Sequence, residues 1–151
     1  MNEYQKLLAY LKVLYHNLTT LHRHLVKDGA WFGNHAQIGE WYEGVSDELD
    51  DLVETGLALG FQEPSIKDSV LTYASECLSC DPRGPEETFR LIFASLQKLC
   101  DLMQAAEAEV PAPIANKLQE YEYHWMKEAE YKIASALGQR ASAGGSEYDD
   151  D

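Results

Sequence analysis

The fold is decided by residues 24–60, whose sequence is HLVKDGAWFGNHAQIGEWYEGVSDELDDLVETGLALG. In its second part, apolar side chains recur every three or four positions, at Ile38, Trp41, Tyr42, Val45, Leu49, Leu52, Val53 and Leu57. This spacing is typical of a long amphipathic α-helix. Asn34 suits the N-cap and Gly60 suits the C-terminal stop, so the sequence predicts one helix over residues 34–59.

The same periodicity predicts three further long helices. One spans residues 4–27 and ends at Asp28-Gly29. Another begins at Pro85, followed by acidic residues in the first turn, and is broken by the prolines at 111 and 113. The last covers residues 114–137, and a shorter periodic piece lies at residues 65–78.

The connections between these helices indicate the fold class. Two junctions are about 5 to 7 residues long, which favours antiparallel neighbours, whereas about 25 residues separate the second helix from the third. A long middle crossover lets those two helices run in the same direction. The sequence therefore predicts an all-α, ferritin-like four-helix bundle over residues 1–139, with a short extra helix in the crossover between helices two and three. Residues 140–151 are predicted to form a disordered acidic tail.

The net charge of the chain limits which molecules it is expected to bind. The chain of 151 residues has 12 Lys and Arg against 26 Asp and Glu, a net charge of −14. Such a chain repels a phosphate backbone and attracts divalent cations, so we expect no direct DNA binding. Charged residues interrupt every apolar stretch, and the first residues do not resemble a signal peptide. We therefore expect a cytoplasmic protein that does not bind a membrane.

Two groups of residues could bind metal, and spacing alone does not decide either case. Cys77 and Cys80 have the spacing of half a zinc site, but no second pair completes it, so reduced loop cysteines are the alternative. Asp50 and Glu54 lie one helical turn apart and could chelate a cation or simply form a solvated acidic face. The five histidines are His16, His22, His24, His35 and His124.

The ordered set of residues in 24–60 resembles the signature of the Dps-type miniferritins, ferritin-like proteins of starved and oxidatively stressed bacteria. In that family a His ends the first helix, a Gly and a Phe follow, a second His opens the second helix, and an Asp and a Glu come 15 and 19 residues later. The matching residues here are His24, Gly29, Phe32, His35, Asp50 and Glu54.

The resemblance implies a function. It implies that His24, His35, Asp50 and Glu54 are iron ligands of a ferroxidase, which oxidises Fe²⁺ with hydrogen peroxide or dioxygen. It also implies that ferric mineral is stored in a hollow cage, a dodecamer built from twofold dimers, and that this iron storage protects against oxidative stress.

Two departures from the family pattern bear on the activity. The spacing from His24 to His35 is one residue shorter than usual. The family also commonly has an Asp four residues after the second His, where this chain has Gly39. Of the nearby acids Glu40 and Glu43, Glu43, one turn further along the helix, is the better substitute for the missing acid. We expect the loss of that acid to weaken ferroxidase activity.

Helix geometry limits how these ligands can meet. His35 and Asp50 are 15 residues apart on one predicted helix, which is about 22 Å at 1.5 Å per residue. They can share an ion only if the acids come from a second copy, with the two helices antiparallel across a twofold axis. The alternatives are a catalytically impaired ferritin-like shell, and a helical interaction module whose acidic face is merely solvated.

Overall fold

Four long helices make up most of residues 1–138, the part of the chain that the computed structural model describes. They are α1 (Glu3–Arg23), α2 (Trp31–Ala58), α4 (Pro85–Glu107) and α5 (Ala112–Lys127). The crossover contains α3 (Ile66–Thr72) and the 3-10 turn η1 (Ala74–Glu76), and α5 continues into the π-helical η2 (Glu128–Ile133) and α6 (Ala134–Ala136). The predicted all-α fold is confirmed, including the short helix in the crossover. The predicted domain end at residue 139 and the predicted disordered tail lie outside the described residues.

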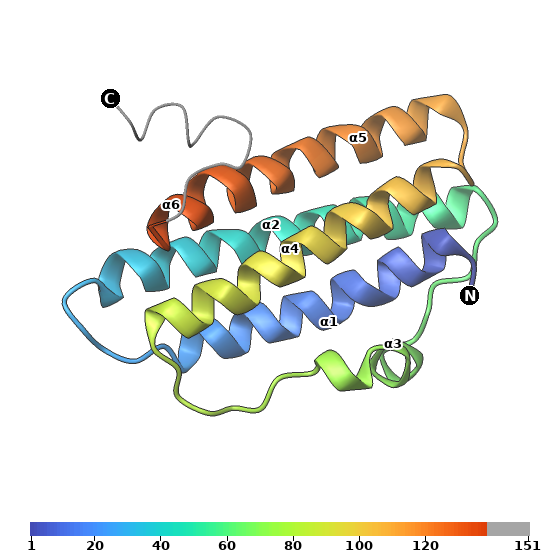
Figure 1. The fold of residues 1–151 in the computed structure, drawn as a ribbon. Helices are drawn as coiled ribbons and strands as arrows, with labels where there is room; N and C mark the ends of the chain where they lie inside the picture. Colours follow the sequence, from blue (N-terminus) through green and yellow to red (C-terminus); the bar gives the residue numbers. More distant parts are fainter. Residues whose placement is uncertain (139–151) are drawn as a thin grey trace, which may run out of the picture.

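The helices form two antiparallel hairpins, α1 with α2 and α4 with α5 (Figure 1). The crossover runs back along the bundle, so α2 and α4 point the same way (Figure 1). α3 packs beside α1 on the outside of the bundle. This is the connectivity that the lengths of the three junctions predict.

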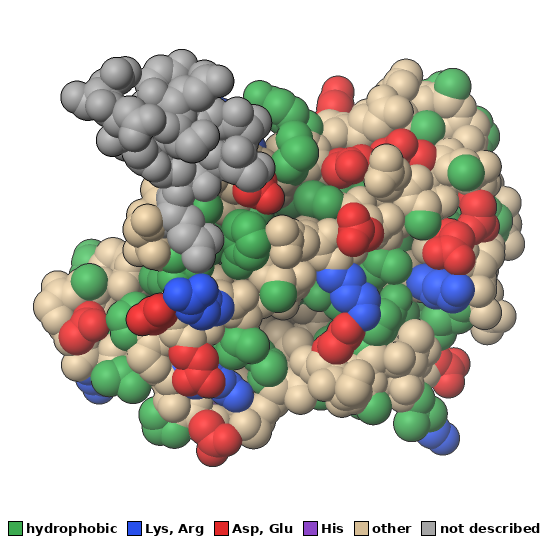
Figure 2. Space-filling view, viewed as in Figure 1, with side chains coloured by type: hydrophobic (Ala, Val, Ile, Leu, Met, Phe, Trp, Pro, Cys, Tyr) green, Lys and Arg blue, Asp and Glu red, His purple; other side chains and the backbone are tan. Residues whose placement is uncertain are grey.

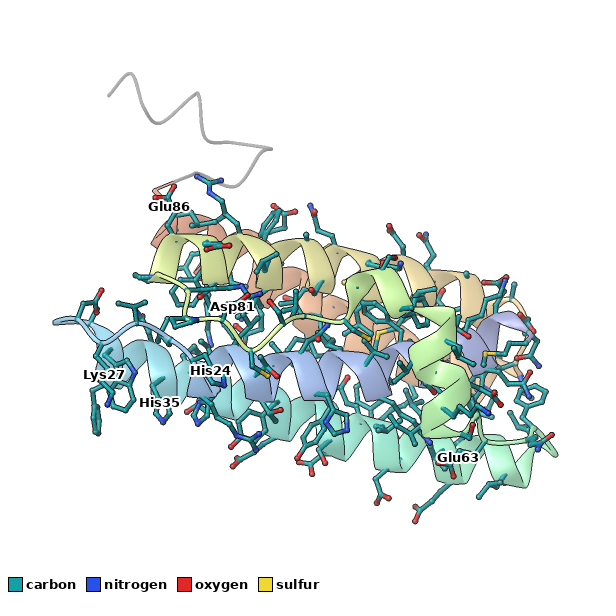
Figure 3. All side chains as sticks on the ribbon, turned by 90° about the horizontal axis from the view of Figure 1, so that it is seen from below. His24, Lys27, His35, Glu63, Asp81 and Glu86 are labelled. Carbon is teal, nitrogen blue, oxygen red and sulfur yellow. The ribbon has the colours of Figure 1, made fainter. Side chains whose placement is uncertain are left out.

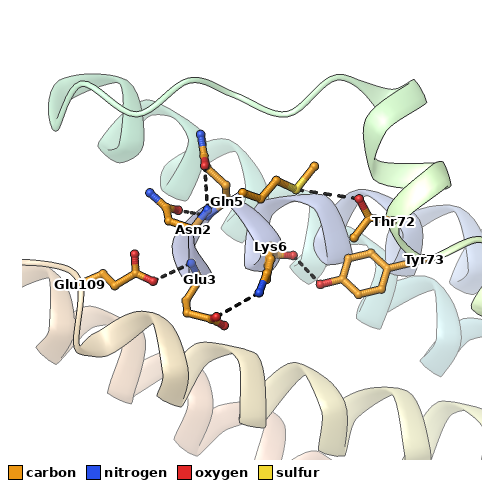
Figure 4. A network of polar contacts seen from close by, with 8 residues as sticks. Asn2, Glu3, Gln5, Lys6, Thr72, Tyr73 and Glu109 are labelled. Carbon is orange, nitrogen blue, oxygen red and sulfur yellow. Dashed lines mark hydrogen bonds and ion pairs between the residues drawn. The ribbon is translucent and has the colours of Figure 1, made fainter.

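The hydrophobic core is centred on α1. Eleven of its 21 residues are buried, because α1 packs against α2, α3 and α4 together. Its first turn is closed by a capping box between Asn2 and Gln5. Figure 4 shows how the same end is tied to other elements: the Glu3 amide donates to the Glu109 carboxylate at 2.5 Å, and the Tyr73 hydroxyl donates to the Lys6 carbonyl at 2.9 Å.

The hairpin loop differs from the prediction at both ends. α1 ends at Arg23 rather than residue 27, because the crossover captures the backbone that follows: Val26 N–H donates to Arg83 O at 2.9 Å, and Arg83 N–H donates to His24 O at 3.1 Å. α2 begins at Trp31, so the predicted cap Asn34 lies inside its first turn. None of the helices within residues 1–138 has the length and apolar character of a membrane span.

α1 and α2 approach most closely at Gly56. A Cβ atom built at residue 56 would lie 2.9 Å from Cε1 of Tyr4, closer than real Cβ contacts come. The Tyr4 ring is fixed there because its hydroxyl donates to the Leu52 carbonyl at 2.5 Å. A residue without a side chain is therefore required at position 56.

We predict that Gly56→Ala lowers the free energy of unfolding by about 1–3 kcal/mol, because the added methyl overpacks against Tyr4. Gly33→Ala is the matched control, since no atom lies within 4 Å of its Cβ position. That variant should gain roughly 0.5–1 kcal/mol from helix propensity. Urea unfolding followed by circular dichroism measures both, and equal stability of the two variants would contradict the packing argument.

Candidate metal centre

Two histidines meet where the α1–α2 hairpin closes. The rings of His22 and His35 stack with centroids 3.6 Å apart and planes at 20°. Each ring bonds to the backbone of the other residue: Nδ1 of His22 lies 2.8 Å from the His35 carbonyl, and Nδ1 of His35 lies 3.0 Å from the His22 carbonyl. A carbonyl only accepts, so both Nδ1 atoms carry the proton. In the neutral rings, both Nε2 atoms then keep a lone pair, which is the form that binds a metal ion.

Aromatic rings hold this histidine pair in place. Trp31 stacks on His35 with centroids 4.2 Å apart, and the Tyr42 ring meets His22 edge-on at 5.2 Å. Burial lowers the pKa of the His22 imidazole, and its hydrogen bond to the His35 carbonyl only partly opposes this shift. His22 therefore stays neutral, and able to bind a metal, to a lower pH than a free histidine.

Gly39, at the position where the family commonly has an acid, lies directly against the His22 ring. A Cβ atom at residue 39 would lie 3.3 Å from Cε1 and 3.6 Å from Nδ1 of His22. The His22 ring thus packs closely over the helix backbone at position 39, and a side chain there would require the ring to shift. The glycine at position 39 therefore allows the His22 ring to pack closely on α2.

His24, predicted as a ligand with His35, is placed differently. It is the C-cap residue of α1, and its carbonyl accepts a hydrogen bond from the backbone N–H of Arg83 in the crossover. Figure 3 shows it at the end of α1 beside the segment that carries Asp81, whereas His35 projects from the first turns of α2. The structure brings His22, and not His24, together with His35.

Asp50 and Glu54 lie on α2, exposed and far along the helix from the histidine pair. Among the described residues, no group of three or more His, Cys, Asp or Glu side chains is arranged to hold a metal ion. One copy of the chain therefore does not assemble the predicted ligand set by itself. Cys77 and Cys80 are free and exposed, and Cys100 is free and half-buried.

Two other acids of α2 face inward and hold α5. The Trp125 indole N–H lies 2.9 and 2.8 Å from the two carboxylate oxygens of Glu48, which is buried. Burial raises the pKa of Glu48 to about 8, and the bond from Trp125 only partly offsets this. The Tyr121 hydroxyl donates to Asp51 at 2.6 Å. These acids serve packing, so they are separate from the exposed acids of the same helix.

The sequence alone leaves the role of His22 open. Its one signal is that the family spacing before His35 falls on Arg23, with a histidine on either side of it. Which of the two turns toward α2 depends on the path of the hairpin loop. That path is set by the pairing with Arg83, a contact from a distant part of the chain.

Comparison with known structures shows the fold. The chain is similar to the X-ray structure of a Dps mutant of Listeria innocua, with a TM-score of 0.81 and 15% identity over 94% of this chain and 99% of that one. It is equally similar to Dps from Listeria monocytogenes, with a TM-score of 0.81 and 17% identity over 93% of this chain and 96% of that one. No family model and no curated protein matches the sequence. The predicted resemblance to Dps proteins is confirmed for the fold.

Glu48 gives a prediction for pH dependence. Its pKa rises from 4.5 in the unfolded chain to about 8 in the fold. The stability that it contributes is thus complete below pH 4.5 and lost as the pH rises toward 8. The unfolding free energy of the wild type should therefore fall by about 4 kcal/mol between pH 4.5 and pH 8 through Glu48 alone. We predict that Glu48→Gln, which cannot titrate, removes this loss.

The measurement is the difference in unfolding free energy between wild type and Glu48→Gln at pH 5 and at pH 8.5. Groups common to both proteins, such as Glu122 with its pKa raised to about 7, cancel in that difference. A difference that does not change with pH would mean that Glu48 is charged in the fold.

Proposed function

We propose that this protein oxidises Fe²⁺ at sites between two copies of the chain and stores the ferric product in a hollow cage, protecting against peroxide. The observation that carries the proposal is the His22–His35 pair, in which both Nδ1 protons are bonded to backbone carbonyls. The likeness to Dps structures supports it, because the fold and nearly the full length of the chain agree. A dodecamer built from twofold dimers is the proposed assembly.

The proposed ligand set has two parts. One copy supplies the Nε2 atoms of His22 and His35, and the partner supplies the carboxylates of Asp50 and Glu54. An antiparallel pairing of two α2 helices brings these together twice in each dimer. Imidazole and carboxylate together suit Fe²⁺ and still hold Fe³⁺, and so few protein ligands leave positions open for an oxidant.

The chemistry balances with hydrogen peroxide as the oxidant. In the overall reaction, two Fe²⁺ ions give one electron each to one hydrogen peroxide molecule, which takes up two protons and is released as two waters. The histidines hold the ion without supplying protons, because each Nδ1–H stays bonded to a carbonyl. With dioxygen the same site would produce peroxide or water, according to how many electrons are delivered.

A catalytically impaired shell is the second candidate, and Gly39 is the observation that favours it. The His22 ring packs over Gly39, and one charged ligand of the family pattern is missing on the histidine side. Such a shell would assemble but oxidise Fe²⁺ no faster than buffer does. Ultraviolet absorbance after aerobic addition of Fe²⁺, with and without peroxide, separates the two candidates.

We predict that Asp50→Asn together with Glu54→Gln slows Fe²⁺ oxidation at least tenfold, because both charged oxygen ligands are lost. Both side chains are exposed, so the unfolding free energy should change by no more than about 0.5 kcal/mol. Asp101→Asn with Glu120→Gln is the matched control, since it removes the same charge from exposed positions on α4 and α5. Unchanged oxidation in the α2 variant would remove both acids from the site.

A second pair of variants distinguishes the two histidines near the end of α1. We predict that His22→Ala slows Fe²⁺ oxidation at least tenfold, whereas His24→Ala, which leaves the His22–His35 stack intact, changes the rate less than twofold. Stopped-flow absorbance of ferric iron gives both rates. The reverse order would return His24 to the ligand position that the sequence predicts for it.

A further inference from the structure

α2 buries little of its surface within one copy of the chain. Only six of its 28 residues are buried, against eleven of 21 in α1. On the opposite side, an exposed stripe recurs every three or four residues, with Phe32 at one end and Leu57 at the other. Between these two apolar residues it consists mainly of acids, which we call the acidic stripe: Glu40, Glu43, Asp47, Asp50 and Glu54. At about 100° per residue, these five lie within an arc of about 80°.

Nothing on α2 balances this charge. The helix has seven acids and no Lys or Arg. The ion pairs found in residues 1–138 include no acid of α2. The face of the molecule that Figure 2 shows is different, because acidic side chains (red) lie beside basic ones (blue) there. In α4, Arg90 pairs with Glu86, and Lys98 pairs with Glu76 of the crossover.

The proposed site fixes the register of two antiparallel α2 helices. If His35 lies level with the partner's Asp50 and Glu54, the twofold axis passes close to residues 43 and 44. Glu43 then meets the partner's Glu43, and Glu40 lies opposite the partner's Asp47. The contact at the axis holds for any crossing angle of the helices, because residues on the axis stay together when the helices rotate.

Closing this interface therefore brings like charges together. Phe32 and Leu57, with 81% and 57% of their surface exposed, lie at opposite ends of the stripe and supply apolar contact at both ends of the paired helices. The acids at the centre oppose it, and they do so more strongly once water is excluded. A divalent cation held by His22, His35 and the partner's acids cancels part of this repulsion, and two such ions bind in each dimer.

We propose that transition-metal cations and the α2–α2 dimer are linked, so that binding of the substrate cation drives assembly of the site that oxidises it. The inference rests on the proposed function, since it uses the same ligands. The cation binds the dimer more tightly than the single chain, because its ligands come from both copies. By linkage, it then strengthens dimerisation by the corresponding factor.

Binding of a cation at the proposed site can be distinguished from general screening of the acidic stripe by the ligands that each metal prefers. Imidazole together with carboxylate suits Mn²⁺, Fe²⁺ and Zn²⁺, whereas Mg²⁺ prefers oxygen ligands and keeps several of its waters. Mn²⁺ is therefore the probe, because it resembles Fe²⁺ in charge and ligand preference and does not oxidise in air at neutral pH on the timescale of the measurement. Mg²⁺ at the same concentration is the control for screening.

The test uses the full chain, freed of metal by a chelator, at low ionic strength. Sedimentation velocity over a range of protein concentrations gives the dissociation constant of the dimer, or of the larger assembly built from it. We expect Mn²⁺ to tighten association at least tenfold and Mg²⁺ to change it less than threefold. Equal effects of the two ions, or tight association in chelator that Mn²⁺ does not change, would overturn the proposal.

Substitutions on α2 test whether its acidic stripe is what weakens metal-free association. Glu40→Gln with Asp47→Asn removes facing charges that are not proposed as ligands, so it should tighten metal-free association at least tenfold. Asp101→Asn with Glu120→Gln removes the same charge elsewhere and should have no such effect. His22→Ala should reduce the response to Mn²⁺ to the size of the response to Mg²⁺, and circular dichroism checks that each variant folds.

Failure of this proposal is distinguishable from failure of the proposed function. Assembly that is independent of metal, in a protein that oxidises Fe²⁺ rapidly, overturns the linkage and leaves the ferroxidase function. Assembly that depends on Mn²⁺, in a protein that oxidises Fe²⁺ no faster than buffer, supports the linkage and rejects the ferroxidase function.

Discussion

The close pairing of α1 with α2 is the constraint on which the rest of the structure depends. A glycine of α2 admits an α1 ring near each end of the pair: Tyr4 lies over Gly56, and His22 lies over Gly39. The two glycines are 17 residues apart, about 25 Å along the helix. The pairing is thus fixed at two distant points. At the second point the same contact that aligns the helices also brings two imidazoles together.

This pairing divides the acids of α2 into two sets. Glu48 and Asp51 face α5 and are held by Trp125 and Tyr121. Desolvation keeps Glu48 protonated near neutral pH, so it adds little charge to the helix. None of the acids of the exposed stripe forms an ion pair within residues 1–138. A single helix therefore serves the core with one face and presents a strongly negative surface with the other.

Much of the fold follows from local sequence, whereas the histidine pair does not. The helices and the direction of the crossover are visible in periodicity, in turn residues and in the lengths of the junctions. The choice between His22 and His24 depends on where α1 ends, and Arg83 sets that end from 59 residues away. The same holds for Glu48, since a carboxylate at a core position is recognised as structural only once Trp125 is placed beside it. Asp50 and Glu54 are predicted from spacing and resemblance alone, and a single copy of the chain leaves them exposed.

The lack of an acid at position 39 leaves the proposed site with one ligand and one negative charge fewer than the family pattern would give it. Two neutral imidazoles from one copy and two carboxylates from its partner carry a charge of −2, which balances Fe²⁺ and leaves one positive charge unbalanced when the ion becomes Fe³⁺. A site with a third carboxylate would instead stabilise the ferric product and retain it. The present set thus favours passing the oxidised ion on, at the expense of driving force for the oxidation itself.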